Sequence, residues 1–134
     1  KLSSTIIMDT GGMKGRRKEL TREELHKTLQ KGFGTSSIHS EYGMTELLSQ
    51  AYSKGNGRFE CPNWMRVTPF ETNDPFAPSQ TEKIGRLNII DLANQESCAF
   101  IATDDLGRLF QDGSFEVMGR LDASDIRGCN LLVY

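Results

Sequence analysis

The sequence holds few of the residues from which metal centres are built. Its 134 residues include two histidines, His26 and His39, and three cysteines, Cys61, Cys98 and Cys129. The cysteines form no CxxC pair of the kind found in zinc sites, and the histidines do not complete such a site. An odd number of cysteines without a metal-binding spacing indicates reduced thiols, so we expect a cytoplasmic protein.

Long apolar runs and an excess of one charge are also missing. The longest apolar runs cover only a few residues, which argues against a membrane-spanning helix. Sixteen basic and eighteen acidic residues give a net charge of −2, so no nucleic-acid or membrane-surface partner is indicated. The length suits one domain or one piece of a larger protein. Because an apolar segment follows Lys1 almost directly, with neither Met nor a polar tail, we expect a fragment.

The first 57 residues predict a strand–helix–strand–helix segment. Its first helix is the best marked element, because Thr21 and Glu24 form a capping box and Gly32 provides a stop. The pair Gly11-Gly12 ends the strand that precedes it. The other expected elements are a strand at 6–8, a strand at 38–39 and a short helix at 46–52.

Residues 58–134 predict a β-rich region. Asp112-Gly113 is a strong signal for a two-residue hairpin, and residues 71–82, rich in Pro, Ser, Thr and Asn, indicate a long exposed loop. The expected strands cover residues 65–70, 86–92, 98–103, 109–110 and 115–118. We therefore expect an α+β fold, in which a βαβα segment (1–57) precedes a small antiparallel, barrel-like region (58–134).

The segment from Tyr42 to Glu46 is a candidate phosphate-binding turn. Gly43 allows the backbone to turn sharply and to approach a ligand closely. A helix that begins near Thr45 would offer unpaired N–H groups and a hydroxyl to an anion, and the Glu46 carboxylate suits Mg²⁺. Tyr42 is placed to stack on a base. In the structural alternative, Thr45 caps the helix, Glu46 complements its dipole and Tyr42 belongs to the core.

Two later segments carry further candidates. The adjacent carboxylates Asp104 and Asp105 follow an apolar strand and can hold ribose hydroxyls or a metal. The alternative is an acidic strand end with a turn at Gly107. Arg120 and Arg127 can each donate hydrogen bonds to a phosphate or a ribose.

Cys129 is a candidate nucleophile. It lies two residues after Arg127, whose positive charge would lower the pKa of the thiol and raise its nucleophilic fraction. The alternative is a buried small apolar residue that leads into the apolar run at 131–133.

Three of these segments, in this order, resemble the motifs of a known superfamily. Residues 40–46 resemble the Tyr-Gly-x-Thr-Glu motif of the adenylate-forming enzymes, which include acyl-CoA synthetases, peptide-synthetase adenylation domains and luciferases. Residues 103–105 resemble the Thr-Gly-Asp motif, and residues 119–122 the Gly-Arg-x-Asp motif. With residues 10–20 and 126–129 included, the chain is most similar to the acyl-protein synthetases, the fatty-acid-activating component of the bacterial luminescence fatty-acid reductase complex.

The resemblance implies a site for ATP or AMP and for Mg²⁺. Gly11, Gly12 and Met13 match a loop that lines the adenine and acyl pocket. Ser40 and Glu41 match positions that face the adenine amino group, and Tyr42 matches the residue beside the base. The remaining matches are Thr45 at the α-phosphate, Glu46 at Mg²⁺, Asp105 at the ribose hydroxyls, Arg120 near the ribose and phosphate, and Asp122 at a hinge.

The chain departs from the superfamily pattern in three ways. Asp104 stands where the Thr-Gly-Asp motif has glycine. The Ser/Thr/Gly-rich phosphate loop is absent from these residues, which again favours a fragment. Only a few residues follow Cys129, and none resembles the domain that carries the superfamily's catalytic lysine. Acyl-protein synthetases share this last feature and move the acyl group to a cysteine of their own near the C-terminus, so the resemblance implies that Cys129 is the acceptor.

We therefore expect part of an ATP-dependent acyl-protein synthetase, which forms acyl-AMP from a fatty acid or another carboxylic acid and transfers the acyl group to Cys129. An acyl-reductase is the implied partner protein. One alternative is a fragment of an acyl- or aryl-CoA ligase, such as a phenylacetate-CoA ligase-like enzyme. Another is a non-catalytic binding module, and the isolated fragment is expected to be inactive.

Overall fold

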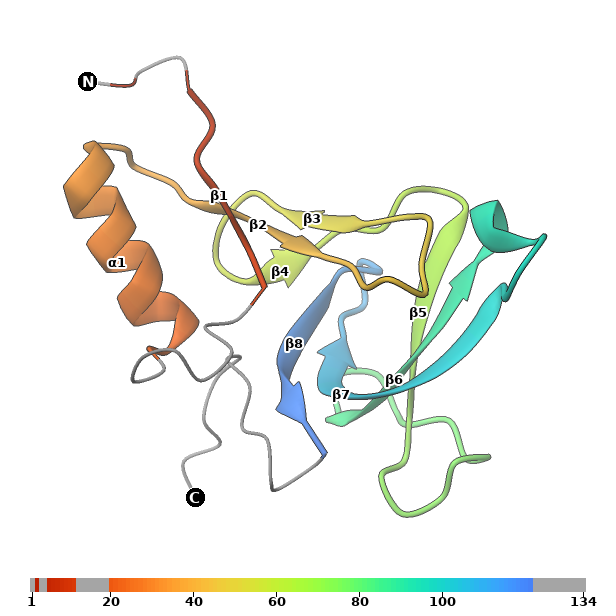
Figure 1. Cartoon of the computed structure of the whole chain (residues 1–134). Coiled ribbons are helices and arrows are strands. Elements are labelled where there is room, and N and C mark those ends of the chain that lie inside the picture. The colour runs from red at the N-terminus through yellow and green to blue at the C-terminus, as the bar shows by residue number, and fades with distance from the viewer. Residues whose placement is uncertain (1, 3–4, 12–19, 122–134) are drawn as a thin grey trace.

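The computed structural model describes residues 2, 5–11 and 20–121, which form two sheets and a helix (Figure 1). One sheet has three strands in the order β1-β2-β3, and the other has five in the order β4-β8-β7-β6-β5. The elements are β1 (Met8–Thr10), α1 (Arg22–Phe33), β2 (His39–Tyr42), β3 (Ala51–Ser53), β4 (Arg58–Phe59), β5 (Met65–Phe70), β6 (Gly85–Asp91), the short 3₁₀ helix η1 (Leu92–Asn94), β7 (Phe100–Leu109) and β8 (Phe115–Arg120).

The helix α1 begins as predicted and ends later than predicted. Thr21 is the N-cap, and its hydroxyl accepts the Glu24 N–H at 3.2 Å while the Glu24 carboxylate accepts the Thr21 N–H at 3.0 Å. The expected stop at Gly32 is wrong. The helix continues to Phe33 and is capped by Gly34, whose φ of +67° ends it and whose N–H donates to the carbonyl of Gln30.

Strands β1 and β2 are parallel and are joined across α1. The first strand lies two residues later than expected, because Met8 is the first residue to pair, opposite His39. The imidazole of His26, on α1, lies 2.7 Å from the Asp9 carboxylate, and the Ser40 hydroxyl donates to the same oxygen at 2.6 Å. These contacts fix α1 to both strands.

The short helix expected at 46–52 is wrong. Thr45 and Glu46 form a turn, closed by a hydrogen bond from the Leu47 N–H to the Met44 carbonyl, and the chain then extends into β3. The buried carboxylate of Asp91 accepts the N–H groups of Leu48 and Ser49 at 3.0 and 2.8 Å. These N–H groups thus have a partner outside the segment, and a helix is not needed to satisfy them.

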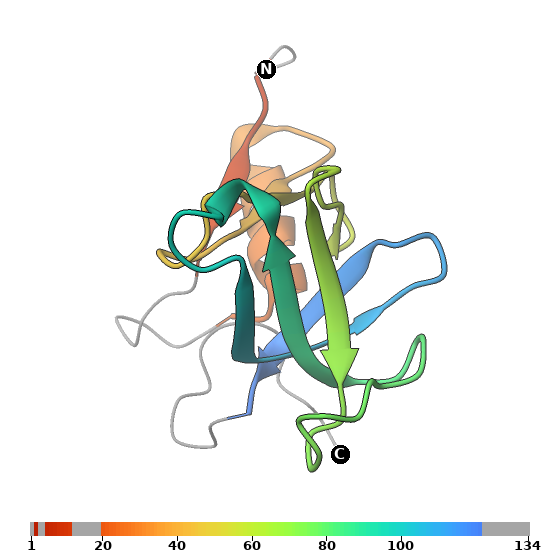
Figure 2. The same cartoon turned by 90° about the vertical axis from the view of Figure 1, so that its right-hand side faces the viewer.

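The five-stranded sheet is antiparallel and curls, so that β5 and β6 lie in front of β7 and β8 in Figure 2. Strand β5 has the predicted bounds. A hairpin at Asp112-Gly113 is confirmed, but its loop has three residues (111–113) and not two, because the Phe110 N–H bonds the Ser114 carbonyl and Gly113 has a φ of +82°. The loop expected at 71–82 connects β5 to β6.

Strand β7 is longer than predicted. One strand, residues 100–109, takes in most of the segments expected at 98–103 and 109–110, so the alternative of a turn at Gly107 is also wrong. The register between β7 and β8 shifts between Leu106 and Gly107 instead. Glycine is needed at 107 because a Cβ there would collide with the carbonyl oxygen of Glu116 on β8.

A core of apolar side chains fills the space between the two sheets. Its centre is aromatic: the rings of Phe59 and Phe115 stack with centroids 5.4 Å apart, and the Tyr42 ring meets Phe115 edge-on at 5.3 Å. The other buried members are Leu47, Ala51, Met65, Val67, Leu87, Ile89 and Val117. The α+β class is confirmed. The division into units 1–57 and 58–134 stays a prediction.

Asp91 connects the five-stranded sheet to the segment that follows β2. Its side chain is fully buried and accepts hydrogen bonds from the Ser49 hydroxyl at 2.7 Å and from the Ala93 N–H at 3.1 Å, besides those from Leu48 and Ser49. Although burial acts to raise the pKa of Asp91, the hydrogen bonds led by Ser49 hold that pKa below its usual value.

We expect Asp91→Asn to lower the free energy of unfolding by about 2 to 4 kcal/mol at neutral pH, because an amide cannot accept every hydrogen bond that the carboxylate accepts. Since the folded pKa of Asp91 is lowered, this contribution is present above the ordinary pKa of about 4 and is lost as the pH falls through the folded value. Urea unfolding at neutral and acidic pH measures both effects.

Asp74→Asn is the matched control. Asp74 is exposed in the loop after β5 and accepts one backbone N–H, that of Phe76. Equal losses of stability in the Asp91→Asn and Asp74→Asn variants would contradict the anchoring role of Asp91.

Candidate functional site

A cavity of about 420 Å³ lies where β1, β2, α1 and β7 meet. We call it the β2 cavity. Its polar wall contains residues from the ends of β1 and β2 and from β7, namely Asp9, Thr10, Gly11, Glu41, Tyr42, Gly43 and Asp105. Its other wall is mainly apolar and contains Leu20, Leu25, Leu29, Phe59 and Val117, with Arg22 beside them. Five residues predicted from the sequence thus lie together: Gly11, Glu41, Tyr42, Gly43 and Asp105.

Tyr42 joins two of the predicted segments. Its hydroxyl donates to the Asp105 carboxylate at 2.8 Å, across 63 residues of sequence. Its ring packs in the aromatic core and its residue is 9% exposed. Tyr42 is therefore a core residue, as the structural alternative stated, and its hydroxyl also orients Asp105 at the edge of the cavity.

Asp105 lies on β7 in a partly buried position. Burial raises the pKa of its carboxyl group, and the neighbouring Asp104 carboxylate acts in the same direction, while the Tyr42 hydrogen bond and the Arg120 charge oppose them. Arg120, opposite Asp105 on β8, brings its Nε to 4.0 Å from the carboxylate. The main chain of Asp105 is fixed by its N–H, which donates to the Thr103 hydroxyl at 3.0 Å.

Thr45 and Glu46 lie outside the lining of the β2 cavity. Both are exposed in the turn after Gly43, and no helix begins there, so the predicted anion site at a helix N-terminus is wrong. The Glu46 carbonyl accepts a hydrogen bond from the Asn94 side chain at 2.8 Å, which fixes the turn.

The described residues contain no group of three His, Cys, Asp or Glu side chains that could hold a metal ion. Mg²⁺ is nevertheless compatible with Glu46, because this ion keeps several waters and is commonly held by one or two carboxylates together with substrate phosphates. The exposed Glu46 carboxylate provides a ligand of this kind.

Sequence reasoning missed the cluster of Asp9, His26 and Ser40. The Ser40 hydroxyl lies 3.2 Å from the His26 ring nitrogen and 2.6 Å from Asp9, and the residue is 1% exposed. Ser40 does not line the β2 cavity, so its predicted position near adenine stays a prediction. No spacing signal reveals the cluster, because its members come from three separate elements.

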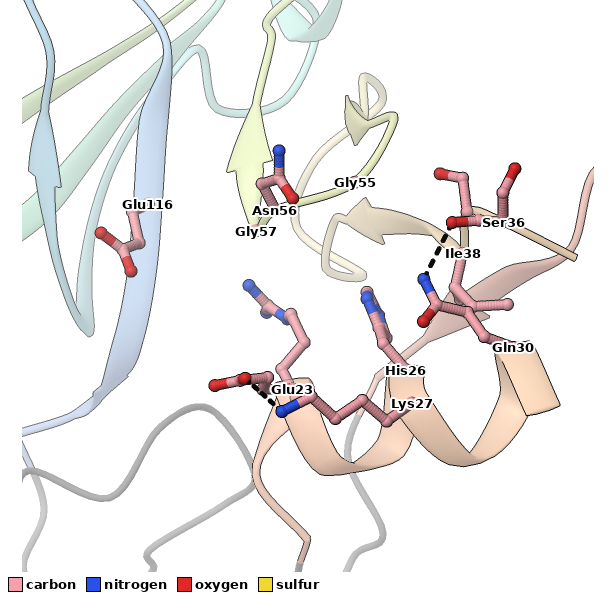
Figure 3. Close-up of a pocket in the computed structure, with 12 residues that line it drawn as sticks. Glu23, His26, Lys27, Gln30, Ser36, Ile38, Gly55, Asn56, Gly57 and Glu116 are labelled. Atoms are coloured by element: carbon pink, nitrogen blue, oxygen red, sulfur yellow. Dashed lines mark hydrogen bonds and ion pairs between the residues drawn. The ribbon is translucent and has the colours of Figure 1, made fainter.

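A second cavity, of about 500 Å³, lies on another side of α1 (Figure 3). Several of its polar side chains bond to nearby groups: Lys27 pairs with Glu23 at 2.6 Å, and the Gln30 amide donates to the Ser36 carbonyl at 3.0 Å. None of the nucleotide-site residues predicted from the sequence lines it. The β2 cavity is therefore the better candidate.

The two described cysteines differ in their surroundings. Burial raises the pKa of the Cys61 thiol to about 11, which leaves little thiolate at neutral pH. Cys98 is exposed. Gly12, Met13, Asp122, Arg127 and Cys129 lie outside the described residues. Within the described part of the chain, no helix is long and apolar enough to cross a membrane.

No family model matches the sequence, and no curated protein matches it. Solved structures do match. MatB from Rhodopseudomonas palustris, bound to ATP, matches 86% of this chain and 25% of its own with a TM-score of 0.62 and 14% identity. O-succinylbenzoate coenzyme A synthetase (MenE) from Bacillus subtilis, in complex with the acyl-adenylate intermediate OSB-AMP, matches across 90% of this chain and 27% of the synthetase. The TM-score is 0.60 and the sequence identity is 20%. A luciferase-like enzyme from the nonluminescent mealworm Zophobas morio matches across 90% of this chain and 33% of its own chain. The TM-score is 0.59 and the sequence identity is 17%.

These likenesses establish the fold. The chain has the α+β architecture of one segment of these adenylate-forming enzymes and spans about a quarter to a third of their length. The expected fold is confirmed, and the likeness to the superfamily beyond the fold stays a prediction. At identities of 14 to 20%, activity and substrate are a separate question.

Tyr42→Phe tests the hydrogen bond to Asp105. We expect a loss of about 1 to 2 kcal/mol of stability at neutral pH and a further rise in the pKa of Asp105, because the hydroxyl stabilises the ionised carboxylate. Because the folded pKa of Asp105 is raised, the ionisation of Asp105 lowers the stability of the protein as the pH rises through this folded pKa. Below this pKa the carboxyl group is neutral in both proteins, so the stability lost in Tyr42→Phe becomes smaller. Urea unfolding and NMR titration of the Asp105 carboxyl carbon measure these effects.

Tyr52→Phe serves as the control, because Tyr52 is 45% exposed on β3. An Asp105 that titrates at the wild-type pH in Tyr42→Phe would refute the role of the hydroxyl.

Proposed function

We propose that this chain is part of an enzyme that activates a carboxylic acid with ATP, and that the β2 cavity is the nucleotide side of its active site. The observation that carries the proposal is the hydrogen bond from Tyr42 to Asp105. It joins the Tyr-Gly-x-Thr-Glu segment to the Thr-x-Asp segment at one cavity. The fold, shared with structures that hold ATP or an acyl-adenylate, supports the same reading.

The residues around the cavity suit the parts of a nucleotide. Gly11, Gly43 and Glu41 line one part of the cavity. A nucleotide base in this space would contact both the polar and the apolar residues of the lining. The carboxylate of Asp105 is an acceptor for ribose hydroxyls. The Arg120 guanidinium, 41% exposed at its side chain, is available for a phosphate beside the ribose.

The proposed first step forms a mixed anhydride. A carboxylate oxygen of the acid bonds to the α-phosphorus of ATP, and the bond between that phosphorus and the bridging oxygen of pyrophosphate breaks. Thr45 and Arg120 stabilise the charge that develops on the phosphoryl oxygens. Mg²⁺, held by Glu46 and the phosphates, would neutralise phosphate charge.

The finer proposal is an acyl-protein synthetase. The Cys129 thiolate attacks the acyl carbonyl of acyl-AMP, a thioester forms, and AMP leaves with the electron pair of the broken carbonyl–oxygen bond. Cys61 is poorly suited to this step, because its thiol is half-buried and its pKa is raised to about 11. A fatty acid is the proposed substrate and an acyl-reductase the proposed next enzyme.

A second candidate is a ligase that transfers the acyl group to coenzyme A. It is favoured by the match to MenE, which is a coenzyme A synthetase. Both candidates share the adenylation step and differ in the thiol that receives the acyl group.

Incubation of the full-length protein with ATP and a panel of carboxylic acids tests the proposal. We expect acid-dependent exchange of radioactive pyrophosphate into ATP, followed by a protein adduct with the mass of the acyl group. Cys129→Ser is expected to remove the adduct and to retain the exchange, because the thiol acts only after adenylation. Cys98→Ser is the matched control, since Cys98 is exposed and is expected to leave the adduct unchanged.

An adduct that persists in Cys129→Ser would exclude the acceptor role. Formation of acyl-coenzyme A without a protein adduct would favour the second candidate. Absence of exchange with every acid would refute the adenylation step itself.

A further inference from the structure

Four charged side chains form a row across three strands beside the β2 cavity. Arg86 lies on β6, Asp104 and Asp105 on β7, and Arg120 on β8. The Arg86 guanidinium lies 2.5 Å from the Asp104 carboxylate. Arg120 spans both acidic residues, with its Nη2 3.9 Å from Asp104 and its Nε 4.0 Å from Asp105. Positive and negative groups therefore alternate along this row.

One member of the row lines the β2 cavity and the other three do not. Asp105 lines it and accepts the Tyr42 hydroxyl, while Arg86, Asp104 and Arg120 do not line it. Asp104 also contributes its carbonyl oxygen, which accepts the N–H of Leu121 at 2.8 Å just after β8. The main chain and side chain of Asp104 thus both contact the end of the strand that carries Arg120.

Two adjacent carboxylates would repel each other without a cation between them. Arg86 neutralises the side of Asp104 that faces β6, and Arg120 lies on the side that faces β8. Without Asp104, the Arg120 guanidinium would have Asp105 as its one remaining carboxylate in the row. The Arg120 guanidinium is thus shared about equally between Asp104 and Asp105, at separations longer than a hydrogen bond, so it does not occupy the Asp105 carboxylate as a hydrogen-bond donor.

We propose that Arg86 and Asp104 are positioning residues that hold Asp105 and Arg120 in the arrangement that binds the ribose of a nucleotide. This inference rests on the proposed function. Arg86 fixes Asp104, Asp104 holds one end of the Arg120 guanidinium, and Asp105 keeps an acceptor oxygen for a ribose hydroxyl. The resemblance assigns no role to Arg86, and Asp104 occupies a position that is glycine in the superfamily motif.

The ion pairs of the row contribute little to folding, because the side chains of Arg86, Asp104 and Arg120 are 27 to 41% exposed. Variants at Arg86 and Asp104 should therefore fold. Their effect is expected in the recognition of the ribose hydroxyls, a property that a purely structural ion pair would not change.

Calorimetric titration of the full-length protein with AMP and with 3′-deoxyAMP tests the inference. The ratio of the two dissociation constants reports the ribose contact. We expect wild type to prefer AMP about tenfold, as for one hydrogen bond to a charged group, and Asp104→Asn to bring this ratio close to one. Arg86→Gln should give the same loss, and the double variant should be no worse than either single variant, since both residues act through one contact.

Glu116→Gln is the matched control. Glu116 pairs with Arg108 at 2.9 Å between the same two strands, β7 and β8, and within the described part of the chain its carboxylate forms no ion pair with Arg120. The ratio of the dissociation constants for 3′-deoxyAMP and AMP in Glu116→Gln should equal the ratio in wild type. An unchanged ratio in Asp104→Asn, or an equal fall in Glu116→Gln, would overturn the positioning role.

The outcomes also separate this inference from the proposed function. Protein that binds AMP with the expected ratio but shows no pyrophosphate exchange would refute the adenylation step and support the ribose site. Protein that exchanges pyrophosphate but has the same ratio in Asp104→Asn would support adenylation and refute the positioning role. Wild type that binds no AMP would overturn both.

Discussion

The position of Tyr42 is the constraint on which the rest of the structure depends. Its ring packs against Phe59 and Phe115, which belong to the five-stranded sheet, while its backbone belongs to β2 of the three-stranded sheet. Its hydroxyl ends on Asp105, in the middle of β7. One side chain therefore fixes the two sheets relative to each other and fixes an acidic group beside the cavity. Packing and site geometry are set by the same residue.

Asp91 acts on the segment that follows. A turn with its N–H groups facing a buried carboxylate is stable because the carboxylate satisfies several donors at once and is itself stabilised by them. Residues 46–52 were predicted to be helical from their local pattern, but this pattern cannot show an acceptor more than 40 positions away in the sequence. The tertiary hydrogen bonds outweighed the local preference, and the anion site expected at a helix N-terminus does not form.

The features that the sequence predicted correctly are those whose causes are local. The capping box at Thr21, the hairpin at Asp112-Gly113 and the alternation that defines β5 each lie within a few neighbouring residues. The features that were missed depend on distant partners: His26 with Asp9, and Arg86 with Asp104. The candidate site falls between these classes. The resemblance to the motifs, which occur in the same order in this chain, pointed to Tyr42 and Asp105 as site residues. The hydrogen bond between them is visible only in the three-dimensional structure.

Asp104 stands at the position where the motif that this segment resembles has glycine. A glycine at such a position can indicate a backbone conformation that other residues avoid. Asp104 lies within β7 without a positive φ, and the register of this strand against β8 shifts between Leu106 and Gly107, where a Cβ on residue 107 would not fit. The constraint at 104 is therefore one of charge. An aspartate beside Asp105 requires a nearby cation, and Arg86 on the adjacent strand provides it. Asp104 and Arg86 form one coupled feature of this chain: a change at Asp104 removes the carboxylate that pairs with Arg86, and a change at Arg86 leaves Asp104 with the more distant Arg120.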